Sequence, residues 1–117
     1  MIITNTMVEY AYYIAKKVHN CSLTRSEGRV EISKETGMKI GSANDYITVF
    51  LEMMAGKEYH RTINNYATRY YLENIRDDFG NEALNKAVFA TDRHTKYYGT
   101  LGKGNLTGIE RMVKEFK

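Results

Sequence analysis

The chain has 117 residues, of which 43% are hydrophobic and 26% are charged, and it contains neither proline nor tryptophan. A chain of this length is expected to form a single domain over residues 1–117, and its composition excludes collagen-like, mucin-like and proline-rich disordered classes. Its 17 basic and 14 acidic side chains give a net charge of +3, which permits nucleic-acid binding without requiring it.

Membrane insertion and disulfide chemistry are not expected. No apolar run approaches the roughly 20 residues of a membrane-spanning helix, and the N-terminus lacks the basic region and apolar core of a secretory signal. The single cysteine, Cys21, excludes an intramolecular disulfide and a cysteine-based zinc cluster. We therefore expect a soluble, cytoplasmic protein without a membrane partner.

Apolar residues recur with the 3.6-residue period of an α-helix, and no sustained two-residue alternation is present. The predicted fold class is all-α, a compact bundle of five or six helices. Capping patterns and glycines place an irregular turn at residues 24–28 and helices at about 6–21, 29–36, 42–55, 62–79, 81–98 and 107–116. Cys21 is expected on the inner face of the first helix. The predicted core residues are Ile14, Val18, Phe50, Met53, Ile75, Phe79, Leu84, Val88 and Val113.

Residues 29–55 have the order of a helix-turn-helix, with a short helix, a turn at Gly37 and a longer helix. In such a motif the N-terminal end of the second helix enters the major groove of DNA. Ser42, Asn44, Asp45 and Thr48 would then face base edges, with Asn44 suited to adenine, and Lys39 would face a phosphate. In the alternative interpretation, Gly37 and Gly41 are ordinary helix caps and Ser42 is an N-cap.

Two further segments combine basic and aromatic side chains, which together suit a nucleic-acid backbone or an unpaired base. The first surrounds the loop before the fourth helix and contains Lys57, Tyr59, His60, Arg61 and Arg69. The second spans residues 93–105 and contains Arg93, Lys96 and Lys103, beside Tyr97 and Tyr98. In the alternative interpretation both are solvated connections, with the ring of Tyr59 packed on the core.

No enzyme motif is complete. Lys103 lies between glycines, but a P-loop needs a glycine in place of Tyr97 and a Ser or Thr in place of Gly104, so nucleotide hydrolysis is disfavoured. The three histidines are too far apart in sequence for a local metal motif, and we expect no cofactor and no metal. A Cys21 nucleophile with His94 as its base is left open, although a buried structural cysteine is more common.

From residue 36 to residue 98 the chain resembles the helical domain that precedes the nuclease region in bacterial HNH-type restriction endonucleases. The resemblance implies a DNA-recognition or targeting module of a restriction system, without a catalytic cluster of its own. Any nuclease activity would reside in a covalently linked domain of a larger protein. The similar runs are Thr36-Gly37-Met38, residues 42–47, 59–64 and 67–72, Phe79-Gly80, and residues 94–98.

A second class of function competes with DNA binding. Charge is nearly balanced, and the ten tyrosines include three adjacent pairs that must each place one ring toward the surface of a helix. These features are typical of a helical protein-interaction or dimerisation domain, and a homodimer is one form that it would take.

Overall fold

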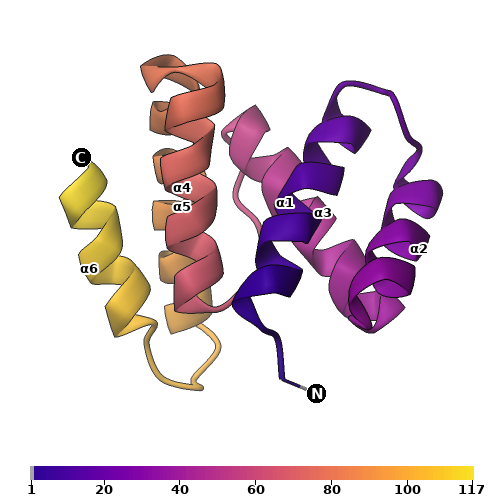
Figure 1. Cartoon of the computed structure of the whole chain (residues 1–117). Helices are drawn as coiled ribbons and strands as arrows, with labels where there is room; N and C mark the ends of the chain where they lie inside the picture. The colour runs from indigo at the N-terminus through magenta and orange to yellow at the C-terminus, as the bar shows by residue number, and fades with distance from the viewer. Residues whose placement is uncertain (1) are drawn as a thin grey trace.

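The computed structural model describes residues 2–117, and over this range the chain forms α-helices and no strand (Figure 1). The all-α prediction is confirmed, and the described residues contain no helix that is long and apolar enough to cross a membrane. The helices are α1 (Asn5–His19), α2 (Arg25–Thr36), α3 (Ile40–Ala55), α4 (Asn65–Phe79), α5 (Asn81–Gly99) and α6 (Thr107–Phe116).

The helices form two groups that share one core. In Figure 1, α1, α2 and α3 lie on one side of the molecule and α4, α5 and α6 on the other. Each of the first three helices contacts the other two, while α3 also packs on α5 and α1 on α4. The helices α3 and α1 therefore join the two groups.

Several helices begin at other residues than those predicted. Helix α1 starts earlier, because the side chain of Thr4 accepts the Met7 backbone N–H at 3.2 Å, and it ends at His19. Helix α3 begins at Ile40, two residues before Ser42, so Ser42 is not its N-cap. Helix α6 has no side-chain cap. Helix α4 is capped by Asn64, whose Oδ1 accepts the Ala67 N–H at 2.8 Å, and not by Thr62.

The segment predicted as an irregular turn, residues 24–28, is the first turn of α2. Thr24 Oγ1 accepts the Glu27 N–H at 3.1 Å, and Glu27 Oε1 accepts the Thr24 N–H at 2.9 Å, which completes a capping box. The prediction failed because Gly28 was interpreted as a helix breaker. The helix ends as predicted at Gly37, whose φ of +81° places it in the left-handed region.

The core is centred on aromatic side chains from α1, α3 and α4. The rings of Tyr12 and Tyr71 both lie edge-on against Phe50, at centroid distances of 5.4 and 5.9 Å. The Tyr12 hydroxyl reaches the rim, where it donates to Asp78 Oδ2 at 2.8 Å, and Lys16 pairs with the same oxygen at 2.9 Å. These two partners, Lys16 first, lower the pKa of the Asp78 carboxyl.

Most of the predicted core residues are buried, with two exceptions. Val18 is only partly buried, and Phe79 is 39% exposed, so its assignment to the core was wrong. The Phe79 ring lies at the surface against the rings of His19 and Phe50. Cys21 was also misplaced. It lies beyond the end of α1, is exposed, and has a φ of +67°.

Gly28 is buried at the junction of α1, α2 and α3. A Cβ atom at this position would approach Val18 Cγ2 to 2.7 Å and Ile47 Cδ1 to 3.2 Å, which is closer than carbon atoms pack. The missing side chain therefore lets α2 pack directly on both neighbours. By contrast, the Cβ position at Gly41 in α3 has no atom within 4 Å.

Gly28→Ala is expected to lower the free energy of unfolding by about 1–2 kcal/mol, because the stiff Val18 side chain must move to admit the methyl group. Gly41→Ala is the matched control and should raise it by about 0.5–1 kcal/mol, since alanine is the better helix former in open space. Urea unfolding followed by circular dichroism measures both. Equal effects of the two substitutions would contradict the packing at Gly28.

Candidate nucleic-acid interface

Helices α2 and α3 are joined by a short turn over residues 37–39 that is anchored at both ends. Thr36 Oγ1 donates to the Ile32 carbonyl at 2.7 Å and accepts the Met38 N–H at 3.1 Å. The Met38 side chain is buried, as is Ala43 in the first turn of α3, where a small residue allows close packing. The relative placement of the two helices is therefore fixed by both the turn and the core.

The N-terminal half of α3 has one face that the core does not cover. Of the residues predicted to meet DNA, Lys39 is exposed, and Ser42, Asn44 and Thr48 are half-buried. Asp45 is also half-buried. All five predicted positions on this segment are thus at the surface of the molecule.

Arg25, which the sequence analysis did not select, lies across this face from α2. Its Nη1 donates to Thr48 Oγ1 at 2.6 Å and to Asn44 Oδ1 at 3.2 Å. The sequence feature that could have pointed to Arg25 is the Thr24 capping box, because it makes residue 25 the first residue of α2. Which face of α3 that residue would reach depends on how the two helices pack, and the sequence alone does not reveal this.

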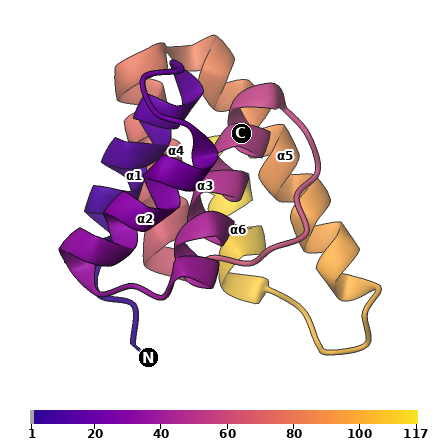
Figure 2. The same cartoon turned by 90° about the vertical axis from the view of Figure 1, so that its right-hand side faces the viewer.

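The two basic and aromatic segments that are separated in sequence come together in the structure. The connector of residues 56–64 runs alongside α5 in Figure 2. Arg93 Nε lies 3.4 Å from Glu58 Oε1, and the rings of His60 and Tyr97 are stacked with their centroids 3.7 Å apart. His60 Nε2 also lies 2.8 Å from Glu58 Oε2, and His60 and Arg93 both lower the pKa of the Glu58 carboxyl.

Arg61 links this connector to α3. Its Nε lies 3.5 Å from Asp45 Oδ1, while 69% of its side chain remains exposed. A groove of about 350 Å³ opens between the connector and the adjoining part of α3. Exposed Lys57 lines this groove together with Thr48, Glu52, Glu58, His60 and Arg61. The cations and the exposed face of α3 therefore form one continuous surface.

Tyr59 is not part of that surface, and its prediction as a DNA contact was wrong. The residue is 1% exposed, its hydroxyl donates to Thr91 Oγ1 at 3.1 Å, and its ring stacks on that of His94 at 4.4 Å. The alternative interpretation, with the ring packed on the core, is the correct one. The reason is that α5 supplies a buried partner 32 residues further along the chain.

His94 holds the connector on α5. Its Nδ1 lies 2.6 Å from the Tyr59 carbonyl oxygen, which can only accept, so Nδ1 carries the proton. In the neutral ring, Nε2 then accepts a hydrogen bond from the Thr62 hydroxyl at 3.1 Å. Thr62 lies two residues before Asn64, which is the N-cap of α4. Burial lowers the pKa of His94. With both ring nitrogens engaged, His94 is not available as a base for Cys21.

The remaining predicted contacts lie elsewhere. Arg69 pairs with Glu115 and lies over the Phe116 ring, at the contact between α4 and α6. Lys96 pairs within α5 with Asp92 at 3.2 Å, and Lys103 is exposed on the connector between α5 and α6. Within residues 2–117, the ion pairs of Arg69 and Lys96 are with residues outside α3.

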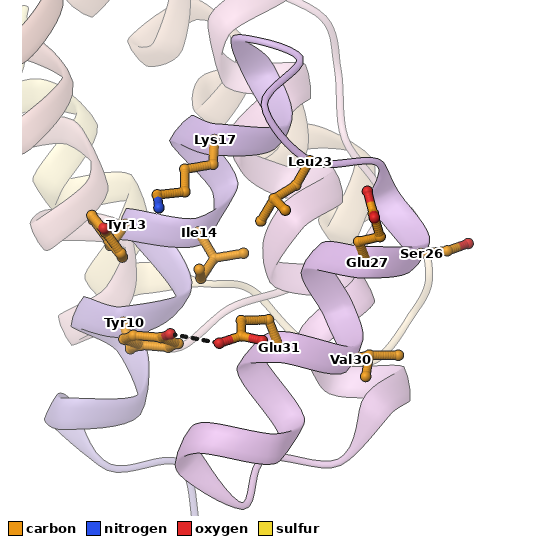
Figure 3. Close-up of a pocket in the computed structure, with 9 residues that line it drawn as sticks. All are labelled: Tyr10, Tyr13, Ile14, Lys17, Leu23, Ser26, Glu27, Val30 and Glu31. Carbon is orange, nitrogen blue, oxygen red and sulfur yellow. Dashed lines mark hydrogen bonds between the residues drawn. The ribbon is translucent and has the colours of Figure 1, made fainter.

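A second surface feature lies between α1 and α2, where side chains of both helices line a groove of about 660 Å³ (Figure 3). Two large hydrophobic side chains are exposed at this groove, Tyr13 to 48% and Val30 to 51%. Lys17 lies over the Tyr13 ring on the α1 side, and the Tyr10 hydroxyl donates across the groove to Glu31 at 3.3 Å. The groove thus has an apolar floor between a cation and a carboxylate.

Comparison of the chain with protein-family models, curated proteins and solved structures found no match. Over residues 2–117, no group of three or more His, Cys, Asp or Glu side chains is arranged to hold a metal ion. The geometry of the side chains described above is therefore the basis for assigning a function.

The free energy of unfolding is expected to fall between pH 7.5 and pH 5.5. The unfolded chain protonates His94 near its ordinary pKa of 6.5, whereas burial lowers the pKa in the folded state, so the unfolded state binds more protons as the pH drops. The loss should reach about 1 kcal/mol. His94→Gln should be less stable at pH 7.5, and it should lose most of the pH dependence in this window. Chemical denaturation at several pH values makes the comparison.

Proposed function

We propose that this protein binds duplex DNA through the exposed face of α3, with α2, the turn at Gly37 and α3 acting as a helix-turn-helix. The observation that carries the proposal is the placement of cations from several elements around that face. Arg25 comes from α2, Lys39 from the turn and Arg61 from the connector that follows α3. Such an arrangement suits a helix that enters the major groove with flanking phosphates on both sides.

The roles of the side chains follow from their chemistry. Polar groups on α3, chiefly Asn44 and Thr48, face base edges, and Lys57, Arg61 and Arg93 neutralise phosphates. Two carboxylates lie among these cations, at Asp45 and Glu58. Each is paired with an arginine, so it orients a guanidinium as well as offsetting its charge.

A biological setting is proposed from the sequence resemblance of residues 36–98 to the domain that precedes HNH-type nucleases. We propose that the chain is the DNA-targeting module of a bacterial restriction-type system in the cytoplasm. In this proposal the module has no catalytic role, and a nuclease domain in the same protein performs the cleavage. Comparing duplexes with and without modified bases is the direct test of that setting.

Replacing Lys57, Arg61 and Arg93 together by alanine should weaken binding to all duplexes alike and reduce the slope of log K against log[salt] by about three, since each phosphate contact contributes about 0.9. Asn44→Ala should instead reduce the discrimination between duplex sequences, because Asn44 lies on the face of α3 proposed to meet base edges and carries no charge for a phosphate. Fluorescence anisotropy titrations at several salt concentrations measure both quantities.

Arg76→Ala is the control for losing a positive charge away from this surface, because Arg76 lies near the end of α4 and pairs with Asp77. It should leave affinity and salt slope unchanged. Unaltered affinity in the triple variant, with its helix content intact, would reject α3 and its surroundings as the DNA-binding surface.

The groove between α1 and α2 favours a second candidate function, homodimerisation. Lys17 lies on one wall and Glu31 on the other, so two copies related by a two-fold axis would place opposite charges together around the exposed Tyr13 and Val30. Val30→Glu should then convert a dimer to a monomer in sedimentation equilibrium. Phe89→Glu, at an exposed apolar residue of α5, should not. A wild-type protein that stays monomeric at all concentrations would remove this candidate.

A further inference from the structure

The hydrogen bonds of Arg25 change what the exposed face of α3 can recognise. An asparagine that reads adenine needs both halves of its amide, because Oδ1 accepts from the adenine N6 amino group while Nδ2 donates to N7. In this structure Asn44 Oδ1 already accepts from Arg25 Nη1 at 3.2 Å. Oδ1 keeps a second lone pair, but it already carries a hydrogen bond from a cationic donor, which makes it a weaker acceptor for the adenine amino group.

Arg25 itself adds further donors at the same place. Over residues 2–117, its recorded hydrogen bonds all come from Nη1, which leaves Nε and Nη2 without a protein acceptor. These two nitrogens lie on one edge of the planar guanidinium and form a fork of parallel N–H groups. The surface over Asn44 and Thr48 is thus a cluster of donors.

We infer that Arg25 is the base-reading residue of this protein and that it selects guanine. Guanine presents two acceptors in the major groove, O6 and N7, which match the free edge of the Arg25 fork. Adenine presents an acceptor beside a donor, so its amino group would face another donor. This inference rests on the proposed function, and it replaces the adenine preference that Asn44 alone would suggest.

Asn44 and Thr48 act in this arrangement as positioning residues. They are four residues apart and so lie on the same face of α3, one turn from each other. Together they hold Nη1 at two points, which restricts a side chain that otherwise loses considerable rotamer freedom when it binds. A preorganised fork binds its target with a smaller entropic penalty. Lysine would keep the charge at position 25 but not the fork.

Selection of binding sites from a randomised duplex library tests the inference with wild type, Arg25→Ala, Arg25→Lys, Asn44→Ala, Thr48→Val and the control Arg76→Ala. Wild type and Arg76→Ala should select sites with guanine at one fixed position. Arg25→Ala should lose the preference there and bind the selected site roughly 10- to 100-fold more weakly, with little change on duplexes that lack the guanine. Arg25→Lys should lose most of the preference, and Asn44→Ala and Thr48→Val should each lose part of it.

Two outcomes would overturn the inference while leaving DNA binding in place. One is a selected adenine that Asn44→Ala abolishes and Arg25→Ala retains, which would make Asn44 the direct reader. The other is an Arg25→Ala variant that binds every duplex more weakly by the same factor with a salt slope reduced by about one, which would make Arg25 a phosphate contact. If wild type shows no salt-dependent binding to any duplex, the proposed function fails and the inference fails with it. Circular dichroism spectra confirm that each variant is folded.

Discussion

The lack of a side chain at Gly28 sets how closely the first three helices approach one another. With only a hydrogen at this position, α2 packs against Val18 of α1 and Ile47 of α3 at the same time. Arg25 lies three residues earlier on α2, so the packing at Gly28 also determines where its guanidinium reaches α3. A core contact without polar atoms thereby controls the geometry of hydrogen bonds at the surface.

The connector between α3 and α4 depends on a different kind of contact. It has no regular structure of its own from Lys57 to Asn64, and buried polar groups hold it in place. His94 bonds to the carbonyl of Tyr59 and to the hydroxyl of Thr62, so both ends of the segment that carries His60 and Arg61 are attached to α5. The exposed cations of the connector therefore project from a fixed backbone rather than from a free loop.

Helical periodicity and glycine position were sufficient to predict the fold class and several helix ends, including those at Gly37 and Gly56. One error concerned two neighbouring residues that could each have capped the same helix. Thr62 was predicted to cap α4, but α4 is capped by Asn64, and the Thr62 hydroxyl bonds to His94 of α5. The local sequence pattern does not show which of two nearby residues caps a helix, because the start of the helix also depends on tertiary contacts.

The candidate site was predicted unevenly for the same reason. The residues of α3 were found because a single helix orders them, and the two basic segments were found separately from their composition. Their association through Arg93 and Glu58, the burial of Tyr59 and the contribution of Arg25 all depend on contacts between elements. Composition identified which residue types were suitable, while packing decided which of them share a surface.

The bonds from Arg25 to Asn44 and Thr48 also join two helices into one energetic unit. Substitutions at residues that share hydrogen bonds are not additive, because the first change removes a partner that the second change would have affected. The order in which positions 25, 44 and 48 are altered should therefore matter for the phenotype of each step. In the proposed role of these residues, a new base preference would be reached more readily by changing the three together than by replacing α3 alone.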